Sequence, residues 1–293
     1  MKMNDYIKLI DEKLDEYIQT EEPQNLFKSM KYTVTLPGKR LRPIMCLETC
    51  KMLDGKWENA IPTACAIEML HAQTLIHDDL PCMDNDDYRR GKLTNHKVFG
   101  EAIATLAGDA LLTYAPQVIT NHSRNLDDTT ILRILNEYFK YAGARGVIGG
   151  QVVDIESEGN LENIENKKEV LEYIHIHKTS DLFQLAMRTG AIIANVDDNK
   201  LNIITEFAQK FGLAFQIADD ILDEISTFEE MGKTLGKDKQ CGKLTYVALY
   251  GIEEAKCKLS CILKECRDIM NEQDIKSEIF EQIILKIQKG AEV

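Results

Sequence analysis

Two clusters of aspartates are the residues of this chain best suited to chemistry. Each has three carboxylates at the end of an apolar run typical of a helix: Asp78, Asp79 and Asp84, then Asp219, Asp220 and Asp223. Asp219 and Asp223 are four residues apart, so on a helix one hard cation or its water shell can reach both carboxylates. In the first cluster Pro81 cannot continue a regular helix, so we expect a turn to bring Asp84 back. One cluster alone would fit a solvated helix end equally well, but two favour a shared divalent-cation site.

Basic residues lie close to the first cluster in the sequence. They follow it at Arg89, Arg90 and Lys92, and a second basic group precedes it: Lys39, Arg40 and Arg42. Phosphate oxygens can be bridged to carboxylates by Mg²⁺ on one side and held by guanidinium groups on the other. The combination of carboxylates and cations therefore predicts a site for two phosphorylated ligands.

The elements that position these residues are predicted to be helices. Apolar residues recur at spacings of three and four, and no sustained alternating stretch indicates a strand, so we expect an all-α fold with negligible sheet. Pro62 is expected to open the helix that carries the first aspartates, and Asp127 or Asp128 to cap a later helix. Residues 226–243 combine glycines with lysines and predict a loop able to close over a diphosphate.

The composition favours one continuous helical domain over residues 1–293. The chain has only six prolines and no Pro/Gly/Ser-rich linker, so nothing divides it in two. Its net charge of -13 argues against a general nucleic-acid or anionic-membrane surface. We find no basic-then-apolar leader and no apolar run of the roughly 18 residues that a membrane span requires. We therefore expect a cytoplasmic protein with neither nucleic acid nor membrane as partner.

The motifs together resemble the short-chain trans-prenyl diphosphate synthases, and among them the bacterial farnesyl diphosphate synthases (geranyltranstransferases). The segments that carry the resemblance are residues 71–101 around the first aspartates, Gly38-Lys39-Arg40-Leu41-Arg42-Pro43, Gly149-Gly150-Gln151-Val152-Val153-Asp154, His177-Lys178-Thr179 and residues 211–223. The resemblance implies one polyprenyl synthetase domain over 1–293, folded as an isoprenoid-synthase-type helical bundle around a deep central cavity. It also implies a homodimer.

The resemblance further implies a Mg²⁺-dependent head-to-tail condensation. An allylic diphosphate, dimethylallyl or geranyl, loses diphosphate, and the double bond of isopentenyl diphosphate attacks the resulting cation to give mainly farnesyl diphosphate. Three Mg²⁺ ions are implied at the metal-site carboxylates Asp78, Asp84, Asp219 and Asp223, with Asp79 orienting the groups around them. The departing diphosphate is expected to take the proton.

The remaining roles are carried over from the resemblance residue by residue. Isopentenyl diphosphate is expected to bind Lys39, Arg42, His71 and Arg90. The allylic diphosphate is expected to bind Arg89, Lys178 and Lys233. The expected catalytic residues are Lys178, Thr179 and Gln216, the last two through oxygens that stabilise the cation.

Product length is predicted from the helix turn that precedes the first cluster. Gln73 and Thr74 lie there, and Gln73 occupies the position where enzymes of this type making a fifteen-carbon product often have an aromatic residue. A geranylgeranyl diphosphate synthase therefore remains an alternative. A non-catalytic partner subunit and a terpene cyclase are less favoured, because both clusters and the basic Lys39, Arg42 and Arg90 are intact.

Overall fold

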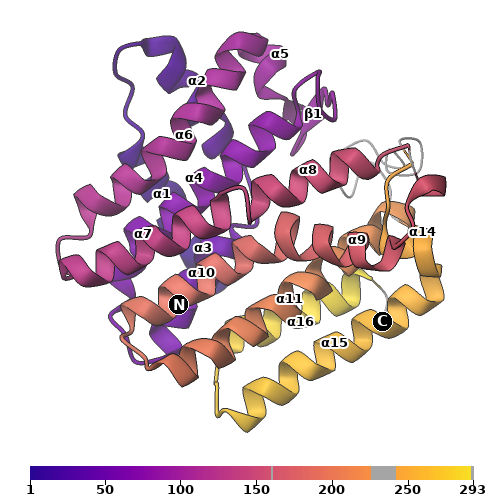
Figure 1. The fold of residues 1–293 in the computed structure, drawn as a ribbon. Helices are drawn as coiled ribbons and strands as arrows, with labels where there is room; N and C mark the ends of the chain where they lie inside the picture. The colour runs from indigo at the N-terminus through magenta and orange to yellow at the C-terminus, as the bar shows by residue number, and fades with distance from the viewer. Residues whose placement is uncertain (160, 226–241, 292–293) are drawn as a thin grey trace.

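The computed structural model describes residues 1–159, 161–225 and 242–291 and confirms the all-α prediction. Figure 1 shows the helices as a bundle with long members running roughly side by side. The α-helices are α1 Met3–Tyr17, α2 Gln24–Val34, α3 Leu41–Met52, α4 Ile61–Asp78, α5 Asn95–Phe99, α6 Glu101–His122, α7 Asp128–Ala142, α8 Val147–Ser157, α9 Lys167–Ile174, α10 Asp181–Ile193, α11 Asp198–Ile225, α14 Tyr246–Tyr250, α15 Ile252–Glu272 and α16 Glu278–Gly290. The two 3-10 turns are η1 Trp57–Ala60 and η2 Leu161–Asn163, and η3 His175–Ser180 is a π-helix.

The predicted helix starts are found where expected. Pro62 occupies the first turn of α4, where its missing N–H costs no helical hydrogen bond. Asp127 caps α7, and its carboxylate accepts the backbone N–H of Thr130 at 2.9 Å. The described sheet is a single hairpin of two-residue strands, β1 Tyr88–Arg89 and β2 Lys92–Leu93.

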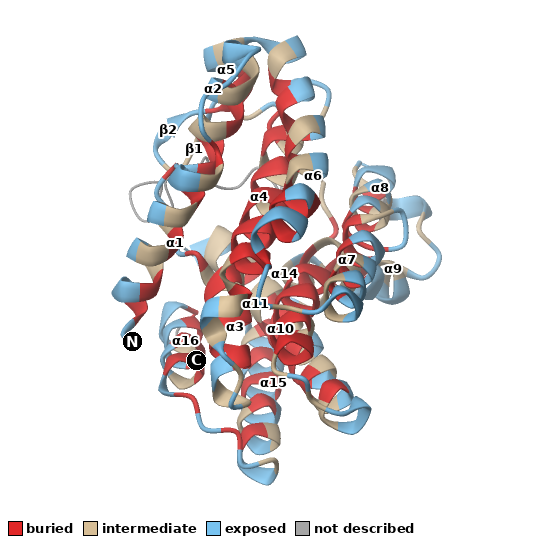
Figure 2. Cartoon of the chain, turned by 90° about the vertical axis from the view of Figure 1, so that its left-hand side faces the viewer, coloured by how far each residue is buried: buried red, intermediate tan, exposed pale blue. Residues whose placement is uncertain are grey.

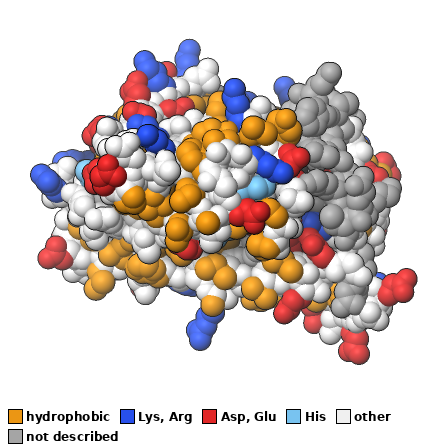
Figure 3. Space-filling model, turned by 90° about the horizontal axis from the view of Figure 1, so that it is seen from above, with side chains coloured by type: hydrophobic (Ala, Val, Ile, Leu, Met, Phe, Trp, Pro, Cys, Tyr) orange, Lys and Arg blue, Asp and Glu red, His pale blue; other side chains and the backbone are white. Residues whose placement is uncertain are grey.

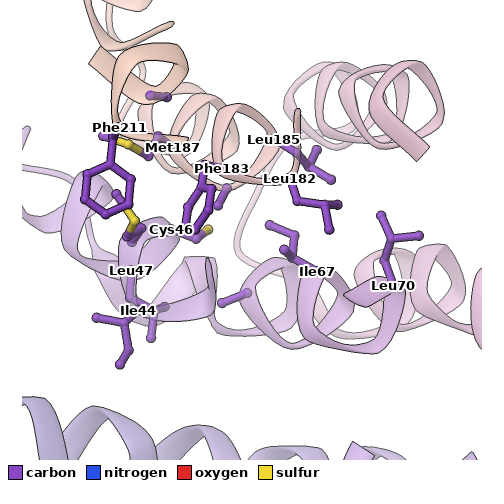
Figure 4. Close-up of a cluster of buried hydrophobic side chains, with 14 of the residues drawn as sticks. Ile44, Cys46, Leu47, Ile67, Leu70, Leu182, Phe183, Leu185, Met187 and Phe211 are labelled. Atoms are coloured by element: carbon purple, nitrogen blue, oxygen red, sulfur yellow. The ribbon is translucent and has the colours of Figure 1, made fainter. Parts of the chain in front are cut away.

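The core lies around α4 and α10, the red central helices of Figure 2. Helix α4 has buried residues on every side, which is typical of a helix enclosed by others. The close-up in Figure 4 shows how α3, α4, α10 and α11 contribute to one apolar cluster: Ile44, Cys46, Leu47, Ile67, Leu70, Leu182, Phe183, Leu185, Met187 and Phe211. This packing fixes α4 relative to α10 and α11, and these helices carry or adjoin the predicted site residues.

Helix α6 is the one described helix that is long and apolar enough, by length and composition, to cross a membrane. The expectation that no segment of the chain reaches this threshold is therefore wrong for α6. Its buried residues, among them Ala104, Ala107 and Leu111, pack along α4. Of its apolar 18-residue window, 39% is buried, so neighbouring helices cover α6 only in part. The exclusion of a membrane partner stays a prediction.

Candidate active site

A central cavity of about 630 Å³ lies between α4, α8, η3 and α11. Its size is that of a small-molecule site. In Figure 3, which views the molecule from above, apolar side chains surround a place where histidine, basic and acidic side chains meet. The cavity brings together most of the predicted site residues: Arg42, His71, Gln73, Thr74, Asp78, Arg89, Arg90, Lys178, Thr179, Gln216 and Asp219.

Four predicted residues lie outside the lining of that cavity. Asp79, Asp84 and Asp223 are close in the sequence to residues that line the cavity, but they do not line it themselves. Lys39 lines a smaller neighbouring cavity of about 260 Å³, which shares Phe215 and Asp219 with the central one. Lys233, and with it most of the predicted loop over 226–243, lies outside the described residues.

The first aspartate cluster folds back as the sequence predicted. Helix α4 ends at Asp78, and the backbone N–H of Asp84 donates to the carbonyl of Asp78 at 2.9 Å. The turn between them is closed by the N–H of Met83, which donates to the carbonyl of Leu80 at 2.9 Å. Pro81 ends the helix, and this turn returns Asp84 to the first aspartate despite their separation of six residues.

The two outer carboxylates of this cluster lie in different electrostatic surroundings. Burial raises the pKa of Asp78, because it disfavours the charged carboxylate. Burial also tends to raise the pKa of Asp84, but the ammonium groups of Lys243 and Lys178 have the larger effect, so the pKa of that carboxyl is lowered. Nζ of Lys243 donates to Asp84 at 3.0 Å. The ammonium group of Lys243, at the end of the predicted loop, therefore contacts Asp84.

Arg89 is held in place by the middle aspartate of the first cluster. Its Nε and Nη2 lie 2.7 and 2.6 Å from Oδ1 of Asp79, which is almost fully buried. Burial raises the pKa of Asp79 to about 6, against the effect of the guanidinium. The β1–β2 hairpin turns at Arg90 and Gly91, both with positive φ, as in the tight turns that join paired strands. The hairpin thereby directs Arg89 and Arg90 to different partners.

Arg90 reaches a second corner of the cavity, where cations gather around one buried carboxylate. Glu68 is 3% exposed; its Oε1 accepts from Nη1 of Arg40 at 2.6 Å and lies 3.8 Å from Nη2 of Arg90. Arg42 stacks over the ring of Phe183, with 4.6 Å from its Cζ to the ring centre. Burial lowers the pKa of Arg42 to about 10 and places that of His71 well below its usual value.

Two polar atoms in this corner have no hydrogen-bond partner among the described residues. They are Nε of Arg42 and Nδ1 of His71, and both are buried. Buried polar groups are nearly always satisfied, so an orphan of this kind calls for a ligand or water. Because one orphan is a guanidinium N–H, an anionic ligand fits this corner.

The π-helix η3 presents Lys178 and Thr179 to the cavity. Its neighbours approach closely because they have glycine there: a Cβ at Gly150 of α8 would overlap the backbone of Lys178, and one at Gly212 of α11 would meet Ser180 at 2.5 Å. Nζ of Lys178 donates a short hydrogen bond to Asp154. The widened turn lets consecutive side chains face α8 and α11, a use of π-turns common at functional sites.

Gln73 and Thr74 line the same cavity, and Gln73 is tied to α6. The ring Nε2 of His77 lies 3.0 Å from the carbonyl of Thr105, an acceptor, so this nitrogen carries the hydrogen. Nδ1 of His77 then accepts from the side-chain amide of Gln73 at 3.1 Å. Gly108 makes room for this ring, because a Cβ there would overlap Nε2 of His77.

The carboxylates supply oxygen ligands on two facing parts of the site. Within the described residues, no three Asp, Glu, His or Cys side chains already converge on one point. Asp78 and Asp219 nevertheless line the same cavity from α4 and α11, and hard oxygen donors are what Mg²⁺ requires. Mg²⁺ commonly completes its shell with water and substrate phosphates, so this donor set fits the ion.

Several residues of this site were missed from the sequence. Glu68 and His77 lie in the same apolar helix as the first cluster, where a charged or polar residue on a buried face is a usable signal. Asp154 belongs to the motif over residues 149–154, but no role was predicted for it. Lys243 was predicted only as part of the loop over 226–243, and its contact with Asp84 was not predicted. No sequence pattern predicted the apolar wall that α8 contributes to the cavity, which consists of Val147, Ile148, Val152 and Ile155.

Comparison with known proteins shows which family has this arrangement. The model of the family described as Polyprenyl synthetase matches residues 23–283. The chain belongs to this family. A polyprenyl synthetase from Fischerella ambigua (strain UTEX 1903), named dimethylallyltranstransferase, is 46% identical over 88% of this chain and 74% of its own length. The geranylgeranyl diphosphate synthase of Cyanophora paradoxa is 42% identical over 89% of this chain and 86% of its own.

Further similar proteins come from Arabidopsis thaliana. They are named geranylgeranyl pyrophosphate synthases, and two of these are named large subunits of heterodimers. Among solved structures, the geranyltransferase of Helicobacter pylori, complexed with magnesium and isoprenyl diphosphate, superposes with a TM-score of 0.85. It is 29% identical, covering 98% of this chain and 95% of its own.

These relationships establish the reaction at the level of the family. The protein is a prenyltransferase that condenses an allylic diphosphate with isopentenyl diphosphate, and the family depends on Mg²⁺. The expected farnesyl product is not confirmed, because most of the similar relatives carry the name of the twenty-carbon product.

Proposed function

We propose that this polyprenyl synthetase makes geranylgeranyl diphosphate as its main product. The observation that carries this proposal is the position of Gln73 in the cavity wall. An aromatic ring there would narrow the cavity, whereas Gln73 is smaller and its amide is drawn against His77. The twenty-carbon names of the relatives support the same product. Farnesyl diphosphate remains the second candidate, because an amide beside an apolar tail disfavours further growth.

The two diphosphates are proposed to occupy the two basic corners of the cavity. Arg42, His71 and Arg90 hold isopentenyl diphosphate, since all three line the cavity and Nε of Arg42 has no partner among the described residues. Lys39 completes this corner from the neighbouring cavity. Arg89 and Lys178 hold the allylic diphosphate next to the aspartates, together with Lys233.

The metal-site carboxylates are proposed to be Asp78, Asp84, Asp219 and Asp223, with Asp79 acting through Arg89. Three Mg²⁺ ions held there would neutralise the leaving diphosphate. The chain's own residues have two further tasks. Arg89 and Lys178 place cationic groups against the diphosphate oxygens on which charge develops. Lys243 donates to Asp84, a contact that a metal ion on this carboxylate would replace.

Ionisation leaves an allylic cation, which this chain stabilises with oxygens. Thr179 and Gln216 line the cavity together, and the Thr179 hydroxyl donates to Oε1 of Gln216 at 2.6 Å. Both oxygens are proposed to stabilise the cation that forms in the cavity. The carboxylates and His71 of the cavity lining are assigned to metal and diphosphate binding, and both ring nitrogens of His77 are hydrogen-bonded, to Gln73 and to the carbonyl of Thr105. The released diphosphate is therefore proposed to take the proton of the adduct.

The protein is further proposed to act as one domain over residues 1–293, in the cytoplasm and as a homodimer. Large apolar side chains exposed on neighbouring helices support self-association: Leu106 on α6, and Leu132 and Phe139 on α7. Sedimentation of the purified protein should give twice the chain mass, and Leu132→Glu with Phe139→Glu should give single chains. Sedimentation of the unmodified protein as a single chain would contradict the homodimer.

The product assignment is tested by chain length. The purified protein is incubated with geranyl diphosphate, labelled isopentenyl diphosphate and Mg²⁺, and the dephosphorylated products are separated. Twenty-carbon alcohol as the main product supports the proposal. Fifteen-carbon alcohol as the main product, unchanged at longer incubation, replaces it with the farnesyl alternative.

A further inference from the structure

Asp220, the middle aspartate of the second cluster, is hydrogen-bonded to protein groups on both of its oxygens. Oδ1 accepts from the side-chain Nε2 of Gln216 at 2.8 Å, and Oδ2 accepts from the backbone N–H of Tyr246 at 2.7 Å. Nε2 of His175 lies 3.4 Å from Oδ2. The carboxylate is buried and does not line the central cavity. Its surroundings are therefore those of a residue that holds other groups, not of a metal ligand.

The hydrogen bond from Gln216 decides which end of that amide faces the cavity. A side-chain amide is nearly symmetric in shape, and its oxygen and NH₂ group exchange places when it turns over. A carboxylate only accepts hydrogen bonds, so Asp220 requires the NH₂ group of Gln216 on its own side. Gln216 lies one helical turn before Asp220 on α11, which places the two side chains in register. Oε1 is consequently turned to Thr179, whose hydroxyl donates to it at 2.6 Å.

We infer that Asp220 is a positioning residue for the prenyl transfer reaction, an inference that rests on the proposed function. Asp220 fixes the Gln216 amide so that its oxygen, and not its NH₂ group, is presented to the allylic cation. The reversed amide would direct partly positive hydrogens at a developing positive charge. Asp220 thus acts through Gln216 and differs in role from Asp219, which lines the cavity itself.

The substitution Asp220→Asn tests this by exchanging one carboxylate oxygen for an NH₂ group. The backbone N–H of Tyr246 still needs an acceptor, so the remaining side-chain oxygen at position 220 stays with Tyr246 and the new NH₂ group faces Gln216. Two NH₂ groups cannot hydrogen-bond, so the Gln216 amide turns over. We expect kcat to fall on the order of 100-fold, as for loss of one preorganised polar group. KM for both substrates and the Mg²⁺ concentration for half-maximal rate should change less than about threefold, because binding groups are untouched.

A second substitution should restore the oxygen. In Asp220→Asn/Gln216→Glu, the carboxylate introduced at position 216 accepts from the NH₂ group introduced at position 220 and from the hydroxyl of Thr179, so an oxygen again faces the cation. Gln216→Glu alone brings two carboxylates together and should lose activity. The double variant should therefore be at least tenfold more active than either single variant, a pattern that a purely structural role of Asp220 does not produce. Melting temperatures of all three variants are measured in parallel.

The outcomes separate the alternatives. Rescue of kcat in the double variant at a melting temperature equal to that of the single variants supports the inference. If Asp220→Asn alone does not fold, the double variant is compared with Gln216→Glu, and a kcat at least tenfold higher at equal melting temperature supports it. A double variant no more active than the single ones overturns it. So does a raised Mg²⁺ requirement in Asp220→Asn, which would make Asp220 part of the metal site. If the unmodified protein performs no prenyl transfer, the proposed function itself has failed, whereas an active protein without rescue refutes this inference alone.

Discussion

The side-chain amide of Gln73 donates to Nδ1 of His77 at 3.1 Å, and Nε2 of the same ring donates to the carbonyl of Thr105 on α6 at 3.0 Å. Gln73→Tyr should shift the main product to fifteen carbons, because the ring fills the space that the amide leaves open. Gln73→Ala should give products longer than twenty carbons. Product alcohols are separated by chain length to check both.

Gln73→Met is the matched control for this position, because it keeps the length of the side chain and removes the amide. A product pattern like that of the unmodified protein means that size sets the limit. A pattern like that of Gln73→Ala means that polarity does. If all three variants keep the original product, Gln73 has no part in chain length.

Arg42→Ala should weaken the binding of isopentenyl diphosphate and not that of the allylic substrate. Arg42 lines the cavity, and its Nε has no partner among the described residues. A hydrogen bond to a charged group contributes about 1.5–3 kcal/mol, so KM for isopentenyl diphosphate should rise about 10- to 100-fold. Steady-state kinetics should show KM for geranyl diphosphate changed by less than about threefold, a factor well below that range.

The exposed Arg124 provides the control for charge, and Arg124→Ala should leave both KM values unchanged. Arg42→Lys should recover little, because the ammonium group cannot replace a guanidinium stacked over Phe183. An equal rise in KM for the two substrates would show that the division of the basic corners is wrong.

The helices and the first aspartate turn could be predicted from the sequence because their causes are local. Pro62 and Asp127 mark helix starts by their own backbone chemistry, and Pro81 ends a helix wherever it stands. The return of Asp84 to Asp78 needs only the intervening residues. Motif resemblance then brought the distant segments into one site, and eleven of the predicted residues do line one cavity: Arg42, His71, Gln73, Thr74, Asp78, Arg89, Arg90, Lys178, Thr179, Gln216 and Asp219.

What the sequence could not predict depends on contacts between helices. The bond between Lys178 and Asp154 requires the close packing of η3 on α8. Lys39 lies in the neighbouring cavity, beside Arg40, which has a left-handed backbone at φ 48° that no local pattern indicates. Asp220 accepts hydrogen bonds from both Gln216 and Tyr246, and Tyr246 is 26 residues away in the sequence.

Asp78→Asn and Asp219→Asn should each lower kcat by about 100- to 1000-fold without unfolding the protein, because electrostatic stabilisation of the leaving diphosphate is lost. Both should also raise the Mg²⁺ concentration needed for half-maximal rate. Activity titrations against Mg²⁺ and the melting temperature check this. The exposed Asp128 is the matched control, and Asp128→Asn should leave the titration unchanged. A near-normal rate in either cavity variant would remove that aspartate from the metal site.

Asp181 should make the stability of the protein depend on pH. Burial raises the pKa of its carboxyl to about 6, against its hydrogen bond with His177. Between about pH 4 and 6 the folded protein therefore keeps a proton that the unfolded chain has lost. The contribution of Asp181 to the free energy of unfolding should be highest at the lower end of this window and fall as the pH rises through 6, by at most about 3 kcal/mol.

Denaturant unfolding at about pH 4.5, 5.5 and 6.5, values that span this window, measures the slope in the unmodified protein and in Asp181→Asn. The variant cannot ionise at this position, so its slope should be smaller. A slope that is identical in the two proteins would mean that Asp181 titrates near its usual pKa in the folded state.

Prenyl transfer by the unmodified protein tests the proposed function most directly. Geranyl diphosphate and labelled isopentenyl diphosphate are incubated with the protein, with Mg²⁺ present or removed by a chelator, and the labelled prenyl products are quantified. We expect labelled prenyl diphosphate, mainly of twenty carbons, that forms only with Mg²⁺. No incorporation of label with Mg²⁺ present, or equal incorporation after its removal, would contradict it.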